Sequence, residues 1–153
     1  MLVMKRNAAL LFAVLLIAAC SPRVEISASS VHQSNTANGL LEAKEPGWHA
    51  KSPPTYPEIL TFKFPEVQRI SQIGLLPQDG QFIRGPKKIN VEISEAGAIW
   101  KEIYKIENAC NGPTDIWRDH SLGQTVNTKY IRFTILSNCG NPDFLTLRGV
   151  RFK

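Results

Sequence analysis

Near its C-terminus the chain reads Lys129-Tyr130-Ile131-Arg132-Phe133-Thr134-Ile135-Leu136, a run dominated by β-branched and aromatic residues. Such residues pack well on the pleated surface of a sheet, so the run predicts a strand. In the segment 145–152 that follows, apolar and polar side chains alternate almost without interruption. This period of two places one face of a strand in a core and the other in solvent. The end of the chain therefore predicts neighbouring β-strands.

The chain between residue 23 and this end carries the same signal. Its apolar residues alternate or cluster in short runs that end at Gly, Pro, Asn or Asp, and little of it has helical periodicity. About eight strands separated by turn-forming loops predict an all-β fold, a jelly-roll β-sandwich that forms one domain over residues 23–153. The predicted strands are 23–28, 58–64, 69–76, 88–94, 100–107, 115–118, 129–136 and 145–152.

The first nineteen residues have the pattern of an export signal. Lys5 and Arg6 precede twelve uncharged residues, 8–19, a stretch too short to cross a bilayer as a helix. The sequence Ile17-Ala18-Ala19-Cys20 resembles the bacterial lipobox, whose cysteine is acylated before the chain is cut in front of it. The alternative is an ordinary cleaved signal followed by an incidental cysteine.

This resemblance implies a lipoprotein of the bacterial cell envelope. We expect a signal peptide over 1–19, a lipid on Cys20 and a lipid-anchored tether over 20–22 that attaches the protein to a membrane. Ser21 follows the cysteine, which by the same resemblance favours the outer membrane if the cell is Gram-negative.

Charge and cysteine content narrow the classes of partner. Removal of the signal takes away Lys5 and Arg6 and lowers the formal net charge from +5 to +3. The longest basic run that remains is Lys87-Lys88, far short of a nucleic-acid-binding arm, so we expect no nucleic-acid partner.

With Cys20 assigned to lipid, Cys110 and Cys139 remain in polar, turn-rich segments of an exported chain. We predict that they form a disulfide, the alternatives being two separate thiols or a metal pair without further ligands.

Four pieces of sequence, in their order and spacing, resemble one known family. This family is the discoidin-like domain of coagulation factor type C, which overlaps the bacterial carbohydrate-binding module family 32 and has the galactose-binding-like jelly roll. The resemblance covers essentially the whole of the predicted domain. The pieces are Ala28-Ser29-Ser30 with Ala37-Asn38-Gly39-Leu40, Trp48-His49-Ala50, the segment 91–100 that ends at Trp100, and Lys129-Tyr130-Ile131-Arg132-Phe133.

Departures from the family pattern limit what the resemblance implies. Calcium-binding members carry an Asp-Gly-Asp-like turn where this chain has Leu41-Glu42-Ala43, and a glutamate where it has Gly149. Because two carboxylates are lost, we expect no metal site, and we expect no other cofactor. One sugar-binding branch has an arginine where this chain has Pro77-Gln78 and an aromatic residue where it has Ser52. Specificity for galactose is therefore not implied.

The resemblance also implies a ligand surface made by loops at one end of the sandwich. His49 matches a histidine that sugar-binding members use, and Arg84 can replace the missing family arginine. Trp48 and His49 have structural alternatives, in the core and as a satisfied histidine, and Arg84 can be a solvated surface charge. The full set of predicted ligand-binding residues is Trp48, His49, Tyr56, Asp79, Phe82, Arg84, Asn141 and Phe144.

The sequence contains no Gly-x-Ser-x-Gly elbow, His-Glu-x-x-His helix or phosphate-cradling glycine loop. We therefore expect that the protein is not an enzyme. The leading hypothesis is a tethered, non-catalytic binding module for carbohydrate. The alternative is an envelope lipoprotein whose loops dock a protein partner and bind no sugar.

Overall fold

Two long antiparallel strands organise the described part of the chain, residues 23–153 of a computed structural model. They are β3 (Glu58–Leu76) and β6 (Arg118–Asn138), which pair along most of their length. The shorter elements are β1 (Glu25–Ala28), β2 (Trp48–His49), β4 (Pro86–Ser94), β5 (Lys101–Ile106), β7 (Thr146–Leu147) and β8 (Gly149–Phe152), with 3-10 helices η1 (Ala37–Glu42) and η2 (Phe82–Arg84).

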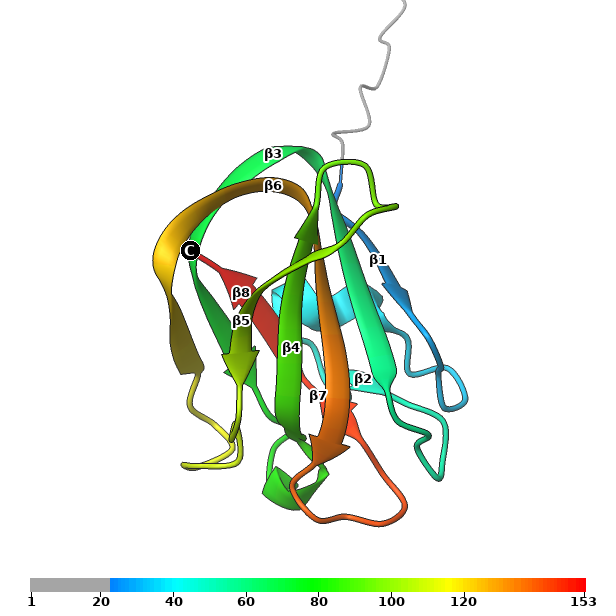
Figure 1. The fold of residues 1–153 in the computed structure, drawn as a ribbon. Helices are drawn as coiled ribbons and strands as arrows, with labels where there is room; N and C mark the ends of the chain where they lie inside the picture. Colours follow the sequence, from blue (N-terminus) through cyan, green and yellow to red (C-terminus); the bar gives the residue numbers. More distant parts are fainter. Residues whose placement is uncertain (1–22) are drawn as a thin grey trace, which may run out of the picture.

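Both long strands bend and so belong to both layers of a sandwich (Figure 1). The first half of β3 lies between β1 and the second half of β6, and β4 and β5 continue this layer. The second half of β3 lies between β8 and the first half of β6 in the opposite layer. Register shifts between Lys63 and Gln68 and between Ile70 and Gln72 mark the bend, as β-bulges do. The all-β sandwich predicted from the sequence is confirmed.

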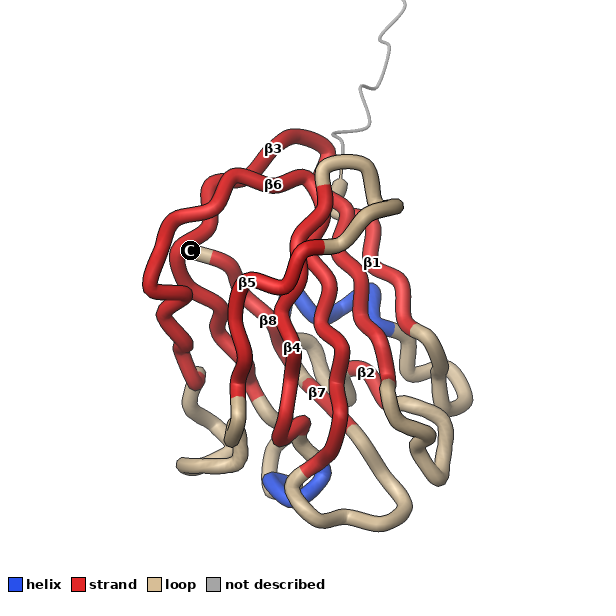
Figure 2. The backbone as a smooth tube through the Cα atoms, viewed as in Figure 1, coloured by secondary structure: helices blue, strands red, loops and turns tan. Residues whose placement is uncertain are grey.

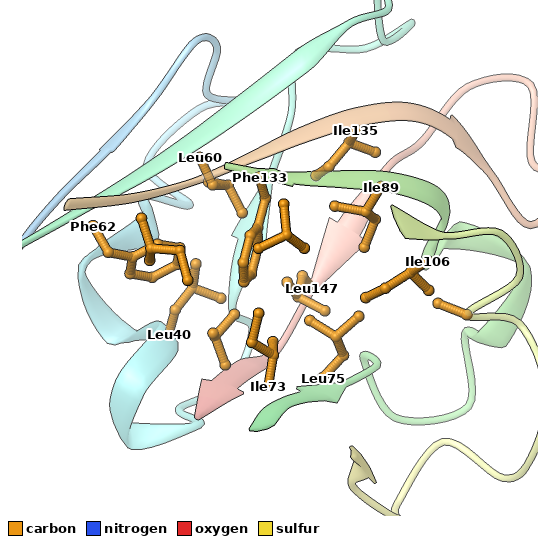
Figure 3. Close-up of a cluster of buried hydrophobic side chains, with 14 of the residues drawn as sticks. Leu40, Leu60, Phe62, Ile73, Leu75, Ile89, Ile106, Phe133, Ile135 and Leu147 are labelled. Atoms are coloured by element: carbon orange, nitrogen blue, oxygen red, sulfur yellow. The ribbon is translucent and has the colours of Figure 1, made fainter. Parts of the chain in front are cut away.

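The core fills the space between the two layers (Figure 3). In the first half of β3, Leu60 and Phe62 alternate with outward-facing residues, and Phe133 on β6 lies against them. The rings of Phe62 and Phe133 are 5.3 Å apart, and Phe152 at the end of β8 lies 5.1 Å from Phe62. Aromatic contacts of this kind add to the free energy of burial, so the C-terminal strand is fixed to both layers at once.

Apart from shifts of one or two residues at strand ends and the unpredicted short strand β2, the strands differ from the prediction in three places. Segments 58–64 and 69–76 form one strand, because β3 continues through the polar bend without a turn. Only Arg118 of the predicted strand 115–118 is in a strand, which then runs on through 119–128 as the start of β6. The predicted strand 145–152 is interrupted at Arg148, where the backbone leaves β7 and begins β8.

The predicted signal peptide, residues 1–19, and the tether, residues 20–22, lie outside the described residues. Between residues 23 and 153, no helix has the length and apolar character needed to span a bilayer.

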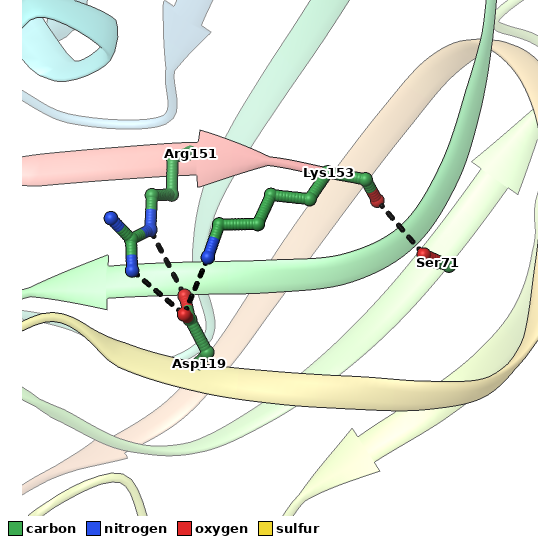
Figure 4. A network of polar contacts seen from close by, with 4 residues as sticks. All are labelled: Ser71, Asp119, Arg151 and Lys153. Atoms are coloured by element: carbon green, nitrogen blue, oxygen red, sulfur yellow. Dashed lines mark hydrogen bonds and ion pairs between the residues drawn. The ribbon is translucent and has the colours of Figure 1, made fainter.

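A cluster of charges joins β6 to β8 across β3 (Figure 4). Asp119 accepts hydrogen bonds from Arg151 at 2.7 and 3.0 Å and from Lys153 at 2.7 Å. These cations lower the pKa of Asp119 to about 2. Asp119 and Arg151 are register partners of Gly74 on its two sides, and a Cβ on Gly74 would lie 2.5 Å from both side chains. The absence of a side chain on Gly74 thus lets the two charges meet over the strand.

We predict that Asp119→Asn lowers the free energy of unfolding by about 1 kcal/mol, the upper range for an exposed ion pair, because one carboxylate serves two cations. Gly74→Ala should act in the same direction by separating Asp119 from Arg151. Denaturant unfolding of both single variants and the double variant forms a cycle. The double variant should lose less than the sum of the single losses, whereas strict additivity would contradict the contact.

Candidate functional site

The loops that carry the predicted site lie together at one end of the sandwich (Figure 2). The chain enters β1 from the opposite end (Figure 1). At the loop end, the short pair β2–β7 sets Trp48 opposite Leu147 and His49 opposite Thr146. Gly47, with φ of +78°, comes so close to β7 that a Cβ would lie 2.4 Å from the carbonyl oxygen of Leu147. A glycine before Trp48 is therefore required for β2 to reach β7.

Trp48 supports the site from within the core. Its side chain is 0% exposed, and its Nε1 donates a 3.0 Å hydrogen bond to the carbonyl oxygen of Ser30. The buried carboxylate of Glu58 accepts hydrogen bonds from the hydroxyls of Ser29 and Ser30. The Ser-Ser pair thus holds the loop 29–57 against β3. The prediction that Trp48 contacts ligand is wrong for this structure, because no face of its ring reaches the surface.

His49 lies on β2 and is nearly buried, with 9% of its surface exposed. Its backbone exchanges hydrogen bonds with the loop before η1, accepting from His32 N at 2.8 Å and donating to Asn35 O at 3.2 Å. Its ring Nε2 is 3.2 Å from Nε2 of Gln78, an amide nitrogen that can only donate, so the imidazole is the acceptor and is neutral. We expected His49 on an exposed loop, and this was wrong.

The pKa of His49 is lowered, in agreement with a neutral ring. Burial is the main cause, and the positive charge of Arg84 and the neighbouring His32 act in the same direction. The carbonyl of Pro46 and the carboxylate of Glu45 oppose the shift.

Arg84 and Phe144 lie together beside His49. The guanidinium carbon of Arg84, on η2, lies 4.5 Å from the centroid of the Phe144 ring, within the range of a cation–π contact. The His32 ring meets Phe144 edge-on at 6.2 Å. Nε of Arg84 and Oε1 of Gln78 are buried without a hydrogen-bond partner among residues 23–153. We call these five residues, His32, His49, Gln78, Arg84 and Phe144, the His49–Arg84 cluster.

The loop that presents Phe144 is held by its own amides. Oδ1 of Asn141 accepts from the backbone N–H groups of Asp143 at 3.0 Å and Phe144 at 2.8 Å. Nδ2 of Asn138 donates to the carbonyl oxygens of Asn141 and Phe144. Asn141 therefore orders the loop, and its side-chain oxygen is already occupied.

The predicted disulfide between Cys110 and Cys139 is confirmed, with a Cα separation of 5.6 Å. It ties the β5–β6 loop to the start of the Phe144 loop. The N–H of Cys139 also donates to the carbonyl of Gly85 next to η2, at 2.9 Å. For the 29-residue separation, the loop-entropy relation gives about 3 to 4 kcal/mol of stabilisation.

The remaining predicted residues lie at the same end but outside the cluster. Tyr56 is 37% exposed, and burial together with Glu58 raises its pKa to about 12. Phe82, on η2, is 53% exposed and is therefore more exposed than Tyr56. Asp79 accepts a 3.3 Å hydrogen bond from Thr114, so its carboxylate faces the neighbouring β5–β6 loop.

The residues at the family's calcium position do not fit a calcium ion. A Cβ on Gly149 would lie 2.8 Å from the Trp117 ring and 3.0 Å from Cβ of Ala43, so carbon atoms fill the space that a carboxylate ligand would need. The one acidic residue there, Glu42, pairs with Lys44. Calcium takes six or more oxygen ligands, and the only carboxylate that Leu41-Glu42-Ala43 and Gly149 offer is that of Glu42.

Comparison with known proteins agrees with the architecture. The model of the F5/8 type C domain matches residues 25–147, and the chain belongs to this family. No curated protein matches the sequence.

Three solved structures that resemble the chain share 14 to 18% identity with it. One is a family 32 module of a Clostridium perfringens protein in complex with GalNAc-β-1,3-galactose, with 18% identity, TM-score 0.71, and 84% of this chain and 94% of that chain covered. A second is the family 32 module of C. perfringens NanJ with galactose, with 14% identity, TM-score 0.70 and 84% and 92% covered. A third is the family 32 module of AlyQ with 4,5-unsaturated mannuronic acid, with 18% identity, TM-score 0.68 and 84% and 93% covered.

Sequence reasoning brought His49, Arg84 and Phe144 together correctly but missed His32 and Gln78. Gln78 had a signal, since it stands at the place of the missing family arginine. His32 had none, because its place beside Phe144 depends on the path of a long irregular loop.

We predict that the domain loses stability between pH 7 and pH 5. Burial lowers the pKa of His49 and of His120, a half-buried residue on β6, below the ordinary 6.5. The unfolded chain therefore binds protons on these rings before the folded chain does, so stability present above pH 6.5 is lost as the pH falls through the folded pKa values. Denaturant unfolding at pH 7, 6 and 5 measures the slope.

The variant His49→Gln/His120→Gln should reduce this slope, since it removes both rings. Asp119 contributes outside the window, because its pKa of about 2 places its loss of stability below pH 4. A wild-type stability that is equal at pH 7 and pH 5 would contradict the burial of neutral histidines.

Proposed function

We propose that the protein is a lipid-anchored, non-catalytic binding module that recognises carbohydrate through the His49–Arg84 cluster. The observation that carries this is a group of planar polar side chains at the loop end: Arg84 and His32 lie against the Phe144 ring, and His49 lies near Arg84 and is bonded to Gln78. Planar donors and acceptors of this kind suit the adjacent hydroxyls of a sugar ring. The family 32 modules of two structural neighbours hold galactose-containing ligands on the same fold, which supports the proposal.

The cluster is held in place before any ligand arrives. β2 is paired with β7, the Phe144 loop is tied by Asn138 and Asn141, and the disulfide fixes that loop to its neighbour. Ordered side chains lose little conformational entropy on binding, which favours affinity for a small ligand.

The proposed anchor and the proposed site are compatible in space. β1 begins at Glu25, five residues after Cys20, and it begins at the end of the sandwich away from the cluster (Figure 1). Five residues reach at most about 18 Å. A lipid on Cys20 would hold the opposite end near the membrane and leave the loop end facing away from it.

A protein partner is the second candidate, favoured by one observation. Phe82 and Ile83 are adjacent on η2 and both are exposed, a pair of apolar side chains suited to a protein contact. Catalysis lacks support in residues 23–153, where no three His, Cys, Asp or Glu side chains gather in a metal-binding arrangement.

A glycan array probed with the purified protein tests sugar binding. We expect Arg84→Ala to weaken binding of any glycan hit about tenfold or more, because a hydrogen bond from a charged donor contributes about 1.5 to 3 kcal/mol. Lys101→Ala, which removes a positive charge from exposed Lys101 on β5, is the matched control and should bind normally. His49→Ala is a poor test, since the buried ring also supports the fold.

An array without a single hit would refute the carbohydrate proposal. Binding that survives Arg84→Ala would place the sugar elsewhere on the domain. If Phe82→Ala instead abolishes capture of a protein partner while no glycan binds, the second candidate is the function.

For the anchor, we predict that Cys20→Ser abolishes lipidation. The wild-type protein should partition into the detergent phase and incorporate labelled fatty acid, and the variant should do neither. A variant that still partitions with membranes would contradict acylation of Cys20.

A further inference from the structure

We infer that the ligand of the His49–Arg84 cluster is an acidic sugar, a uronic-acid unit whose carboxylate pairs with Arg84. This inference rests on the proposed function and names the class of glycan. It rests on three arginines within residues 23–153 that stack on aromatic rings, Arg84, Arg132 and Arg151.

Two of these arginines already hold a carboxylate. Arg132 lies 4.2 Å from the centroid of Trp100 and donates through Nε and Nη2 to Glu92, at 2.8 and 2.7 Å. Arg151 lies 4.5 Å from the centroid of Trp117 and donates through the same two atoms to Asp119, at 3.0 and 2.7 Å. In each case the ring orients the guanidinium and the carboxylate neutralises it.

Arg84 is the third such arginine, and its carboxylate is missing from the described chain. It stacks on Phe144 in the same way but forms no side-chain hydrogen bond and no ion pair within residues 23–153. Its Nε is buried without an acceptor, whereas its two terminal nitrogens are not among the buried unpaired atoms and so reach solvent. A carboxylate approaching from solvent can meet this terminal edge in the paired geometry that guanidinium groups favour.

The carboxylates of the loop end do not take this role. Glu45 pairs with Arg148 at 3.1 Å, and Asp79 accepts from Thr114. Asp143 is exposed in the Phe144 loop and forms no ion pair among the described residues. The charge of Arg84 is therefore left for a ligand.

The aromatic residues of the cluster also favour an acidic ligand. Trp48 is buried, and one face of Phe144 is covered by Arg84 while its ring is met by His32. Within the cluster, the apolar face of a neutral sugar could thus stack only on the part of Phe144 that Arg84 leaves uncovered. The cluster also presents the edge of a cation to solvent. The family 32 module of AlyQ holds an unsaturated mannuronic acid, so a domain of this fold accommodates an acidic sugar.

The test uses the full-length protein purified in detergent and a panel of uronic-acid oligomers, galacturonate, glucuronate, mannuronate and guluronate, each with its carboxyl-reduced neutral counterpart. Calorimetry should find at least one acidic oligomer that binds at least tenfold more tightly than its reduced form. Arg84→Gln should remove that preference, and Arg84→Lys should restore part of it. Lys101→Gln, with its charge removed from outside the cluster, should keep the full preference.

Salt gives a second readout. Raising the ionic strength should weaken binding of the acidic oligomer and leave binding of the reduced oligomer unchanged, because only the former depends on a charge pair at the surface. Thermal unfolding of each variant identifies any that fails to fold.

Each other outcome overturns the inference. Equal affinity for acidic and reduced oligomers, or binding of neutral glycans alone, would refute the acidic ligand while leaving carbohydrate binding in place. If neither acidic nor neutral glycans bind, the proposed function fails together with the inference. A preference for acidic oligomers that survives Arg84→Gln would show that the carboxylate binds a cation other than Arg84.

Discussion

The pairing of β3 with β6 is the constraint on which the rest of the structure depends. The two strands run antiparallel from one layer of the sandwich, through a shared bend, into the other layer. Every other strand of the large sheet joins one of them or extends from a strand that does. The bend shifts the register of β3. The residues that face the core are therefore Leu60 and Phe62 before the bend and Ile73 after it. Both layers therefore close on one core.

The loop end inherits its order from these strands. β6 ends at Asn138, whose amide holds the Phe144 loop, and β3 begins at Glu58, whose carboxylate holds the Ser29–Ser30 loop. The site is thus built where the two organising strands end and begin. Ser29, Ser30 and the buried Glu58, none of which was a predicted ligand-binding residue, thus help to shape the site.

The sequence predicted the fold class, the disulfide and the meeting of His49 with Arg84 and Phe144. Local alternation was enough for strands such as 129–136. It failed for residues 119–128, where Gly123 and polar residues interrupt the alternation, although this segment pairs with β3 and Leu122 and Val126 are buried. Trp48 was misplaced in the ligand site because a motif gives the residue's position but not the direction of its ring. The contact of Gln78 with His49 could not be predicted, because it depends on the end of β3 lying beside β2.

The central claim is that ligand binds at the loop end through the unpaired charge of Arg84. The most direct measurement is an NMR titration of the isotope-labelled protein with an acidic uronic-acid oligomer. The account predicts that the largest shifts belong to the side chains of Arg84, Gln78 and His49 and to the ring of Phe144. The signals of Ile99 and Lys101, which follow the opposite end of β4, should not move. No shifts at the loop end, or shifts centred on another surface such as the groove that Arg69, Phe152 and Lys153 line, would contradict it.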